Sequence, residues 1–364
     1  MFRANLRIAL GILLLVLCSL SWVGIASAGS GIWTSHGPGV PIYALAIDPQ
    51  TPTVLYAGTV AAYGSGGSVF KSPDGGNSWN ATGLASTDVM ALVIDPQNPM
   101  VIYAGTNHGV YKSINGGQLW DNPLQHCYVP PSTYIGLYVQ ALAVDPQNTA
   151  TLYASLNLLE CFGVIKSTDG GGHWTYKRDG LPVPSYVVSV LVIDPQNPNT
   201  LYAGTWGGGV FKSTNGGDNW SAANGGLPST PYVWALAIDP QNPAIVYAGL
   251  NCGGVFKSTD RGQNWNAMNA GLTSLCISSL AIDPRNTATI YAGTKWQQGG
   301  EGVFKSVDGG GHWSAYSDGL ANRSIRALAI DPKDPGTLHA ATGSGVFDIQ
   351  GQSRTYLPFI LRNW

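Results

Sequence analysis

The chain has 364 residues, with 18 Lys and Arg against 20 Asp and Glu and a formal net charge of −2. This balance speaks against a nucleic-acid-binding protein, which needs a basic face. Only 10% of the residues are charged, against about 25% in an average soluble domain, while 48 glycines and 23 prolines indicate many turns. The composition therefore favours an extracellular β protein.

The first 28 residues are predicted to be a secretory signal peptide (1–28). Arg3 and Arg7 form a basic start, 8–25 is largely apolar, and Ala26-Ser27-Ala28 fits a small-residue cleavage site. An uncleaved membrane anchor is the alternative, because the apolar stretch is long. We expect a secreted protein, extracellular or at the cell surface, with no membrane span after cleavage of the signal.

A repeat of about 47 residues fills the rest of the chain. Its Asp-Pro pairs are 44 to 50 residues apart and begin at Asp48, Asp95, Asp145, Asp194, Asp239, Asp283 and Asp331. Repeats of this length, filled with strand-forming residues, are typical of propellers and solenoids. One copy, from Tyr232 to Leu272, has four short apolar runs separated by Gly, Pro, Asp and Asn. Four such strands predict one propeller blade.

The sequence contains seven first strands of the repeat but only six complete four-strand copies. Residues 31–34, around Trp33, match a fourth strand, while 327–347 supply only strands one to three. We therefore predict an all-β, seven-bladed β-propeller of four-stranded blades over 29–350, with the ring closed by the N-terminal strand, which removes open sheet edges. The apolar tail 351–364 is expected to add an outer strand, with a surface-attachment signal as the alternative.

An octapeptide Ser-x-Asp/Asn-x-Gly-x-x-Trp follows six of the third strands. Its third position is occupied by Asp74, Asn115, Asp169, Asn215, Asp260 and Asp308. These side chains can accept bonds from backbone N–H groups of a hairpin, and the tryptophans offer apolar area for packing against the neighbouring blade. Since Asn cannot perform acid/base chemistry, we interpret the position as structural.

This octapeptide resembles the Asp-box (BNR) repeat of the sialidase, sortilin and xyloglucanase type of propeller, over essentially the whole mature chain. The chain is also similar to single-propeller photosystem II assembly factors. The resemblance implies that the box is a structural hairpin on the face opposite the usual ligand site. The last repeat departs from the pattern, because 347–351 has no box.

Four cysteines remain after the signal segment. Cys127 and Cys161 occupy two loop types that open on one face of a propeller, and Cys276 and Cys252 occupy the same two types. We predict the disulfides Cys127–Cys161 and Cys252–Cys276, which a secreted protein permits; four free buried thiols are the alternative. With no Cys-x-x-Cys or His-x-His motif, we predict no metal and no cofactor.

The cysteine-bearing face is the candidate binding face. Near the start of each first strand, one position varies between copies whereas the framework is constant, which indicates either ligand recognition or drift. From this and adjacent positions we select as ligand-binding candidates Tyr43, Tyr138, Gln140, Trp206, Tyr232, Trp234, Trp296 and Arg326. Aromatic faces beside amides and hydroxyls suit a sugar or a peptide; the alternative is that these aromatics only cap the channel.

Catalysis is not expected. A sialidase-like site needs an arginine cluster, which is missing, and an ordinary glycosidase needs two carboxyls about 5–10 Å apart. The candidates on this face are Asp88, Glu160 and Glu301, from three different blades. We predict a monomeric, non-catalytic propeller that binds a glycan or an extracellular or cell-surface protein. The alternatives are a glycoside hydrolase of xyloglucanase- or sialidase-like type and a docking scaffold.

Overall fold

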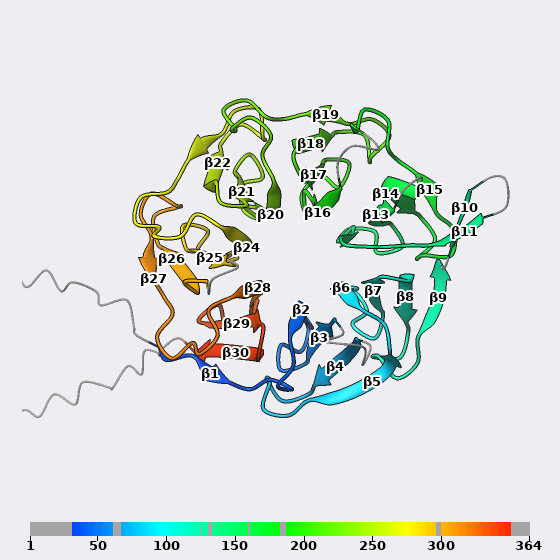
Figure 1. Cartoon of the computed structure of the whole chain (residues 1–364), viewed down its shortest axis with the longest axis horizontal. Helices are drawn as coiled ribbons and strands as arrows, with labels where there is room; N and C mark the ends of the chain where they lie inside the picture. The colour runs from blue at the N-terminus through cyan, green and yellow to red at the C-terminus, as the bar shows by residue number, and fades with distance from the viewer. Residues whose placement is uncertain are drawn as a thin grey trace, which may run out of the picture. The chain divides into compact units, whose positions relative to one another are not determined.

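The computed structural model of the protein describes residues 31–60, 67–124, 126–129, 133–158, 161–182, 187–295 and 300–350. These residues form seven four-stranded antiparallel sheets arranged in a ring (Figure 1). The predicted seven-bladed β-propeller is therefore confirmed. None of the described residues belongs to a helix that is long and apolar enough to cross a membrane. The expected signal peptide and C-terminal tail lie outside the described residues.

Each blade runs from an inner first strand to an outer fourth strand (Figure 1). Blades 1 to 3 consist of β2 (Ile42–Ile47), β3 (Leu55–Thr59), β4 (Ser68–Ser72) and β5 (Asn80–Ala85); β6 (Val89–Ile94), β7 (Ile102–Thr106), β8 (Gly109–Ser113) and β9 (Asp121–Leu124); and β12 (Leu142–Val144), β13 (Leu152–Leu158), β14 (Cys161–Ser167) and β15 (Thr175–Tyr176). A separate hairpin of β10 (His126–Val129) and β11 (Thr133–Gly136) lies between blades 2 and 3 in the chain.

The remaining blades repeat this order. Blades 4 to 6 consist of β16 (Val188–Ile193), β17 (Leu201–Thr205), β18 (Gly209–Ser213) and β19 (Ser221–Ala222); β20 (Val233–Ile238), β21 (Val246–Leu250), β22 (Gly254–Ser258) and β23 (Asn266–Ala267); and β24 (Ile277–Ile282), β25 (Ile290–Thr294), β26 (Val303–Ser306) and β27 (Ser314–Ala315). Blade 7 consists of β28 (Ile325–Ile330), β29 (Thr337–Thr342), β30 (Gly345–Gln350) and β1 (Thr34–Ser35).

The N-terminal strand closes the ring, as predicted. In β1, Thr34 pairs with Asp348 of β30, so blade 7 is built from both ends of the described chain. Trp33 lies just before the strand rather than within it. Its indole is buried, and Nε1 donates to the carbonyl of Tyr316 on blade 6 at 2.7 Å. The same short segment therefore completes one blade and binds the preceding one.

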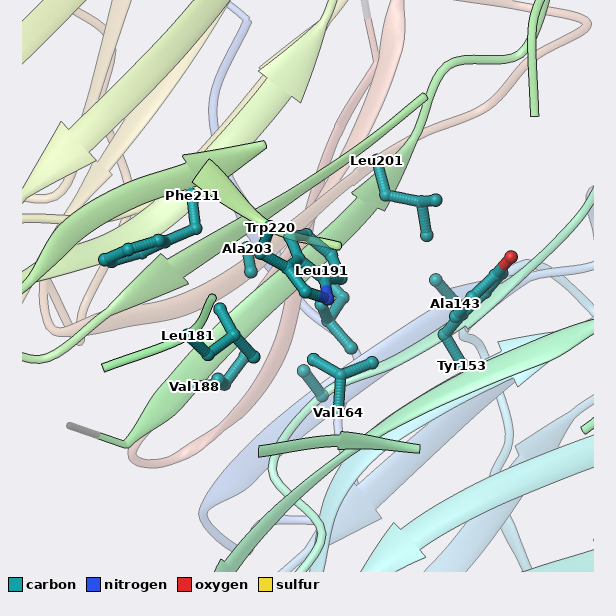
Figure 2. Close-up of a cluster of buried hydrophobic side chains, with 11 residues drawn as sticks. Ala143, Tyr153, Val164, Leu181, Val188, Leu191, Leu201, Ala203, Phe211 and Trp220 are labelled. Atoms are coloured by element: carbon teal, nitrogen blue, oxygen red, sulfur yellow. The ribbon is translucent and has the colours of Figure 1, made fainter. Parts of the chain in front are cut away.

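The hydrophobic core lies between blades. Figure 2 shows Tyr153 and Val164 of blade 3 in one cluster with Leu191 of blade 4. The blades approach closely because the second strand of most copies contains a glycine at the interface. A Cβ on Gly204 would lie only 2.7 Å from the side chain of Val233 of the next blade, well inside contact distance. The repeated glycine thus lets neighbouring sheets pack side by side.

The octapeptide forms the predicted hairpin. In blade 3, Asp169 Oδ1 accepts from the backbone N–H of His173 at 2.9 Å and from the Ser167 hydroxyl at 2.8 Å. These bonds hold the pKa of the Asp169 carboxyl well below its usual range, since they favour the charged form. Asn115 and Asn215 accept the equivalent backbone bond. The position therefore acts as a hydrogen-bond acceptor inside the hairpin.

A backbone carbonyl of this hairpin also accepts hydrogen bonds from the preceding blade. Tyr103 Oη and Lys112 Nζ of blade 2 both donate to the carbonyl of Gly170 in blade 3, at 3.1 and 2.7 Å, and the ammonium lies 5.5 Å from the Tyr103 ring centroid. The same arrangement recurs for Tyr56, Lys71 and Gly116; Tyr153, Lys166 and Gly216; Tyr202, Lys212 and Arg261; and Tyr247, Lys257 and Gly309.

Tryptophans of the octapeptide donate hydrogen bonds from the hairpin back to the preceding blade. Trp265 Nε1 donates to the carbonyl of Ala223 on the preceding blade at 2.8 Å. Trp79, Trp220 and Trp313 make the equivalent interblade bond. Trp120 and Trp174 are different, because they donate to Gly117 and Gly171 of their own hairpins at 3.0 and 2.9 Å. Four of the six octapeptide tryptophans thus make the interblade hydrogen bond, and the other two still pack in clusters with residues of the preceding blade.

The Asp-Pro-Gln turns join the blades at the other end of the first strands. Gln97 Nε2 donates to the carbonyl of Pro146 in the next turn at 3.2 Å. Gln50, Gln147, Gln196 and Gln241 repeat this bond. Lys333 Nζ donates to the carbonyl of Gln50 at 2.6 Å and so connects blade 7 to blade 1.

We predict that Trp265→Phe lowers the free energy of unfolding by about 1–3 kcal/mol, because the carbonyl of Ala223 loses its buried donor. Trp120→Phe is the matched control and should lose less, since its bond lies within one hairpin. Urea unfolding of both variants measures the difference. Equal losses would show that the interblade bond has no special weight.

Blade 7 replaces the interblade Tyr and Lys by His339 and Asp348, which pair across β29 and β30. Both side chains are buried. Asp348 Oδ1 accepts from the Thr34 hydroxyl at 2.6 Å and lies 2.9 Å from His36 Nε2. Burial lowers the pKa of His339, and the opposing attraction of Asp348 and Asp331 is smaller. The neutral imidazole is therefore the form that suits the folded state.

Because the pKa of His339 is lower in the folded protein, its contribution to stability is complete above the unfolded-state pKa near 6.5 and decreases as the pH falls below it. We expect at most about 1.4 kcal/mol of loss per pH unit from this group. His339→Tyr, which restores the residue of the other blades, should reduce that loss. Urea unfolding at pH 8 and pH 5 tests this, and an unchanged pH dependence in the variant would contradict it.

Candidate ligand-binding mouth of the channel

A β-bulge lies near the start of most first strands. In β28, Ile325 pairs with Thr342 and Ala327 with Ala341, so Arg326 is the extra residue. A bulge re-aims the side chain of the extra residue. The residues skipped in the same way are Tyr43, Met90, Ser189, Trp234, Ser278 and Arg326. These are the positions that vary between repeats.

Gln140 takes the equivalent place in blade 3 by other means. That blade has Ser155 where most second strands have glycine, and the backbone N–H groups of Gln140 and Ala141 donate to the Ser155 hydroxyl at 3.3 and 2.9 Å. The side-chain amide of Asn157 donates to Gln140 Oε1 at 3.3 Å. Local hydrogen bonds thus hold Gln140 where the other blades use a bulge.

These seven side chains, which we call the mouth layer, line one cavity of about 280 Å³ together with Trp206 and Lys295. They also line a second cavity of about 260 Å³, which extends along the first strands. The mouth layer consists of Tyr43, Met90, Gln140, Ser189, Trp234, Ser278 and Arg326. The structure therefore brings together five of the eight ligand-binding candidates.

Two members of the mouth layer are used in the fold. The Ser278 hydroxyl donates to the carbonyl of Ile325 on blade 7 at 2.7 Å. Ser189 donates in the same way to Val233 on blade 5. These serines tie neighbouring blades together and leave the larger side chains of the layer to face the cavity.

Two cations sit against aromatic rings in this cavity. The guanidinium carbon of Arg326 lies 3.5 Å from the centroid of the Tyr43 ring, and Lys295 Nζ lies 5.2 Å from that of Trp234. Burial lowers the pKa of both cationic groups. Lys295 was not among the sequence candidates. The available signal is its place directly after a constant second strand, where blade 4 carries Trp206.

The other aromatic candidates are placed differently. Tyr232 is joined to Trp206 by a backbone bridge, and both side chains are exposed, by 48% and 38%. We call Trp206 and Tyr232 the aromatic ledge; of the two, Trp206 lines the cavity. Tyr138 is half-buried and does not line the cavity; burial and the Asp88 carboxylate raise its pKa. Trp296 lies outside the described residues.

No carboxylate is among the described residues that line the cavity. The backbone N–H of Asp88 donates to the side-chain oxygen of Asn107, and the Glu301 carboxylate accepts from the Thr273 hydroxyl. Glu160 lies outside the described residues. In the described part of the chain, no three His, Cys, Asp or Glu side chains are grouped so that they could hold a metal ion.

The predicted disulfide Cys252–Cys276 is present. It connects the loop before β22 in blade 5 to the residue before β24 in blade 6, at the bulge end of both blades. The carbonyl of Cys276 accepts from the backbone N–H of Lys295 at 3.0 Å, so the bridge fixes backbone that positions a cavity cation. Cys161 is disulfide-bonded, but the side chain of Cys127 lies outside those described, and that pairing stays a prediction.

Neither a protein-family model nor a curated protein matches the sequence. Solved structures do match the fold. A GH74 xyloglucanase from Xanthomonas campestris has a TM-score of 0.68 and 18% identity over 87% of this chain and 53% of its own. YCF48 bound to D1 peptide has a TM-score of 0.65 and 14% identity over 88% of this chain and 97% of its own. The chain spans about half of the GH74 chains it matches.

The extracellular domain of a putative hybrid two-component system from B. thetaiotaomicron also matches. Its TM-score is 0.63, with 17% identity over 87% of this chain and 39% of its own. At this level of identity the three likenesses establish the β-propeller fold and leave the ligand open. The chemistry of the mouth must therefore be argued from its own residues.

We predict that loss of the Cys252–Cys276 bridge, which spans 24 residues, lowers the free energy of unfolding by about 3 kcal/mol, because it frees a loop of the unfolded chain. The double variant Cys252→Ser with Cys276→Ser is compared with the natural chain by urea unfolding. As a control, this bridge is selectively reduced in the natural chain. The reduced natural chain and the double variant should then have the same free energy of unfolding. A double variant of natural stability would contradict the prediction.

Proposed function

We propose that this chain is a secreted, monomeric, non-catalytic propeller of the Asp-box type that binds a glycan or protein ligand at the mouth of its channel. The observation that carries the proposal is the convergence of seven variable residues on one cavity. They are aimed there by bulges or local bonds, while the constant residues hold the blades together. Variation between repeats is thus concentrated where a ligand would contact the protein.

The hairpin geometry supports the Asp-box assignment. Serine, acid or amide, glycine and tryptophan each have a bonding role that recurs between blades, for example Ser167 and Asp169 in blade 3. The hairpins lie at the ends of the blades away from the mouth layer. This fits the family arrangement in which the box is structural and the ligand binds on the other face.

A binding role fits the mouth better than hydrolysis does. A glycosidase needs two carboxyls at its reacting centre, and the described lining of the cavity offers cations, aromatics and amides instead. Neither Asp88 nor Glu301 lines this cavity, and the Glu301 carboxylate accepts from the Thr273 hydroxyl. The xyloglucanase-like alternative would therefore need a catalytic pair outside this cavity.

A protein-docking scaffold is the second candidate. The observation that favours it is the match to YCF48 bound to D1 peptide. The match covers 97% of the YCF48 chain and 88% of this one, so the two chains are similar in size. Whether the ligand is a glycan or a protein, it would contact the same mouth residues. The Cys252–Cys276 bridge supports a location in an oxidising compartment, in keeping with the proposed signal peptide.

We expect Trp234→Ala to weaken ligand binding at least about tenfold, because the ring forms part of the cavity wall and supports the Lys295 ammonium. The measurement is a glycan array with the secreted chain, run beside hydrolysis assays on the same polysaccharides and a pull-down from the cell surface. Tyr176→Ala, an exposed aromatic on an outer strand, is the matched control. Turnover of a bound glycan would overturn the non-catalytic assignment.

A further inference from the structure

Arg326 is held in an unusual state. Its guanidinium is stacked on the Tyr43 ring, and two of its donors, Nε and Nη1, are buried with no hydrogen-bond partner among the residues that the structure describes. Buried donors are normally paired, and an unpaired charged donor is especially unfavourable. The lysines of the third strands show the ordinary solution, since Lys112 and Lys166 donate to backbone carbonyls.

The fold does not require this cation. The equivalent positions of the other blades carry neutral side chains, such as Met90 and Trp234, and those blades have the same architecture. A second cation, Lys295, lines the same cavity, and no carboxylate of the described lining compensates either charge. Two confined positive charges, with two unused donors on Arg326, form a site for an anion.

We infer that the ligand of the mouth is an acidic polysaccharide, and that a uronic acid carboxylate binds Arg326 with Lys295 as the second cation. This inference rests on the proposed function. A planar guanidinium with fixed donors matches the geometry of a carboxylate. A uronic acid carries that carboxylate on a sugar ring whose flat apolar face suits stacking on an aromatic side chain.

The ledge of Trp206 and Tyr232 supplies such faces, since both rings are exposed. Trp206 also lines the cavity that holds the two cations. A cavity of about 280 Å³ is at the lower end of ligand pockets, so it accepts a single sugar unit. The rest of the polysaccharide would then lie across the ledge. A carboxylate on a peptide would satisfy the cations without calling for this ledge.

Binding to polygalacturonate and to its methyl-esterified form tests the inference, because the two polymers share a backbone and differ in charge. We expect the acidic polymer to bind at least about tenfold more tightly. Arg326→Gln should remove that preference, and Lys295→Gln should weaken it. Arg323→Gln is the matched control, since Arg323 is exposed on the same face and does not line the cavity; it should bind like the natural chain.

Stability separates a binding role from a structural one. Arg326→Gln removes an unpaired buried charge, so its thermal midpoint should be unchanged or higher, whereas a structural arginine would lower it.

Equal binding of both polymers with no effect of Arg326→Gln would overturn the inference and leave the proposed function intact. Equal losses in the Arg323 and Arg326 variants would overturn it as non-specific attraction. Binding of an acidic peptide alone, dependent on Arg326, would overturn the glycan assignment, and failure of Trp234→Ala to affect any ligand would reject the proposed function itself.

Discussion

The propeller depends on a shared carbonyl between adjacent blades. The carbonyl of Gly216 receives both the Tyr153 hydroxyl and the Lys166 ammonium of the preceding blade, and it belongs to a hairpin that Asn215 holds in shape. Trp220 of that hairpin returns a bond to Lys177. The tyrosine, the lysine, the glycine and the tryptophan each therefore take part in an interblade bond, so a change at one of these positions disturbs an interface as well as a sheet. This explains why the framework hardly varies between repeats.

The constraint also explains where variation is permitted. Most interblade bonds lie along the second and third strands, in the octapeptide hairpins and at the Asp-Pro turns. At the bulge end of the first strands, the Ser189 and Ser278 bonds and the Cys252–Cys276 bridge join neighbouring blades, and the larger side chains of the mouth layer are left free to vary. Side chains as different as Arg326, Met90 and Trp234 can occupy that position because the backbone around it is fixed from elsewhere. Most of the framework bonds and the variable mouth layer thus lie at opposite ends of the same strands. This separation lets one scaffold carry seven variable positions around a single cavity.

The fold could be predicted from the sequence because local signals and the repeat agree. The spacing of the Asp-Pro turns gives the blades, and the unmatched segment at Trp33 gives the closure. The mouth could be predicted in part, since Tyr43, Gln140 and Arg326 occupy a register that can be counted. Lys295 was missed because its significance lies in packing against Trp234, on another blade. The place of Tyr138 outside the cavity depends equally on loop geometry, which spacing does not encode.

The irregular features of the repeat meet in blade 7. It has no octapeptide, it replaces the interblade Tyr and Lys by His339 and Asp348, and it carries Arg326 on its first strand. At its boundary with blade 6, Lys305 lies over the ring of Tyr291, as the equivalent lysines do in the other blades, and also over the ring of Tyr316. The bond from Trp33 to Tyr316 provides a direct hydrogen bond across this boundary. Ring closure by the N-terminal segment therefore supplies an interblade bond where blade 7 has no octapeptide to offer one.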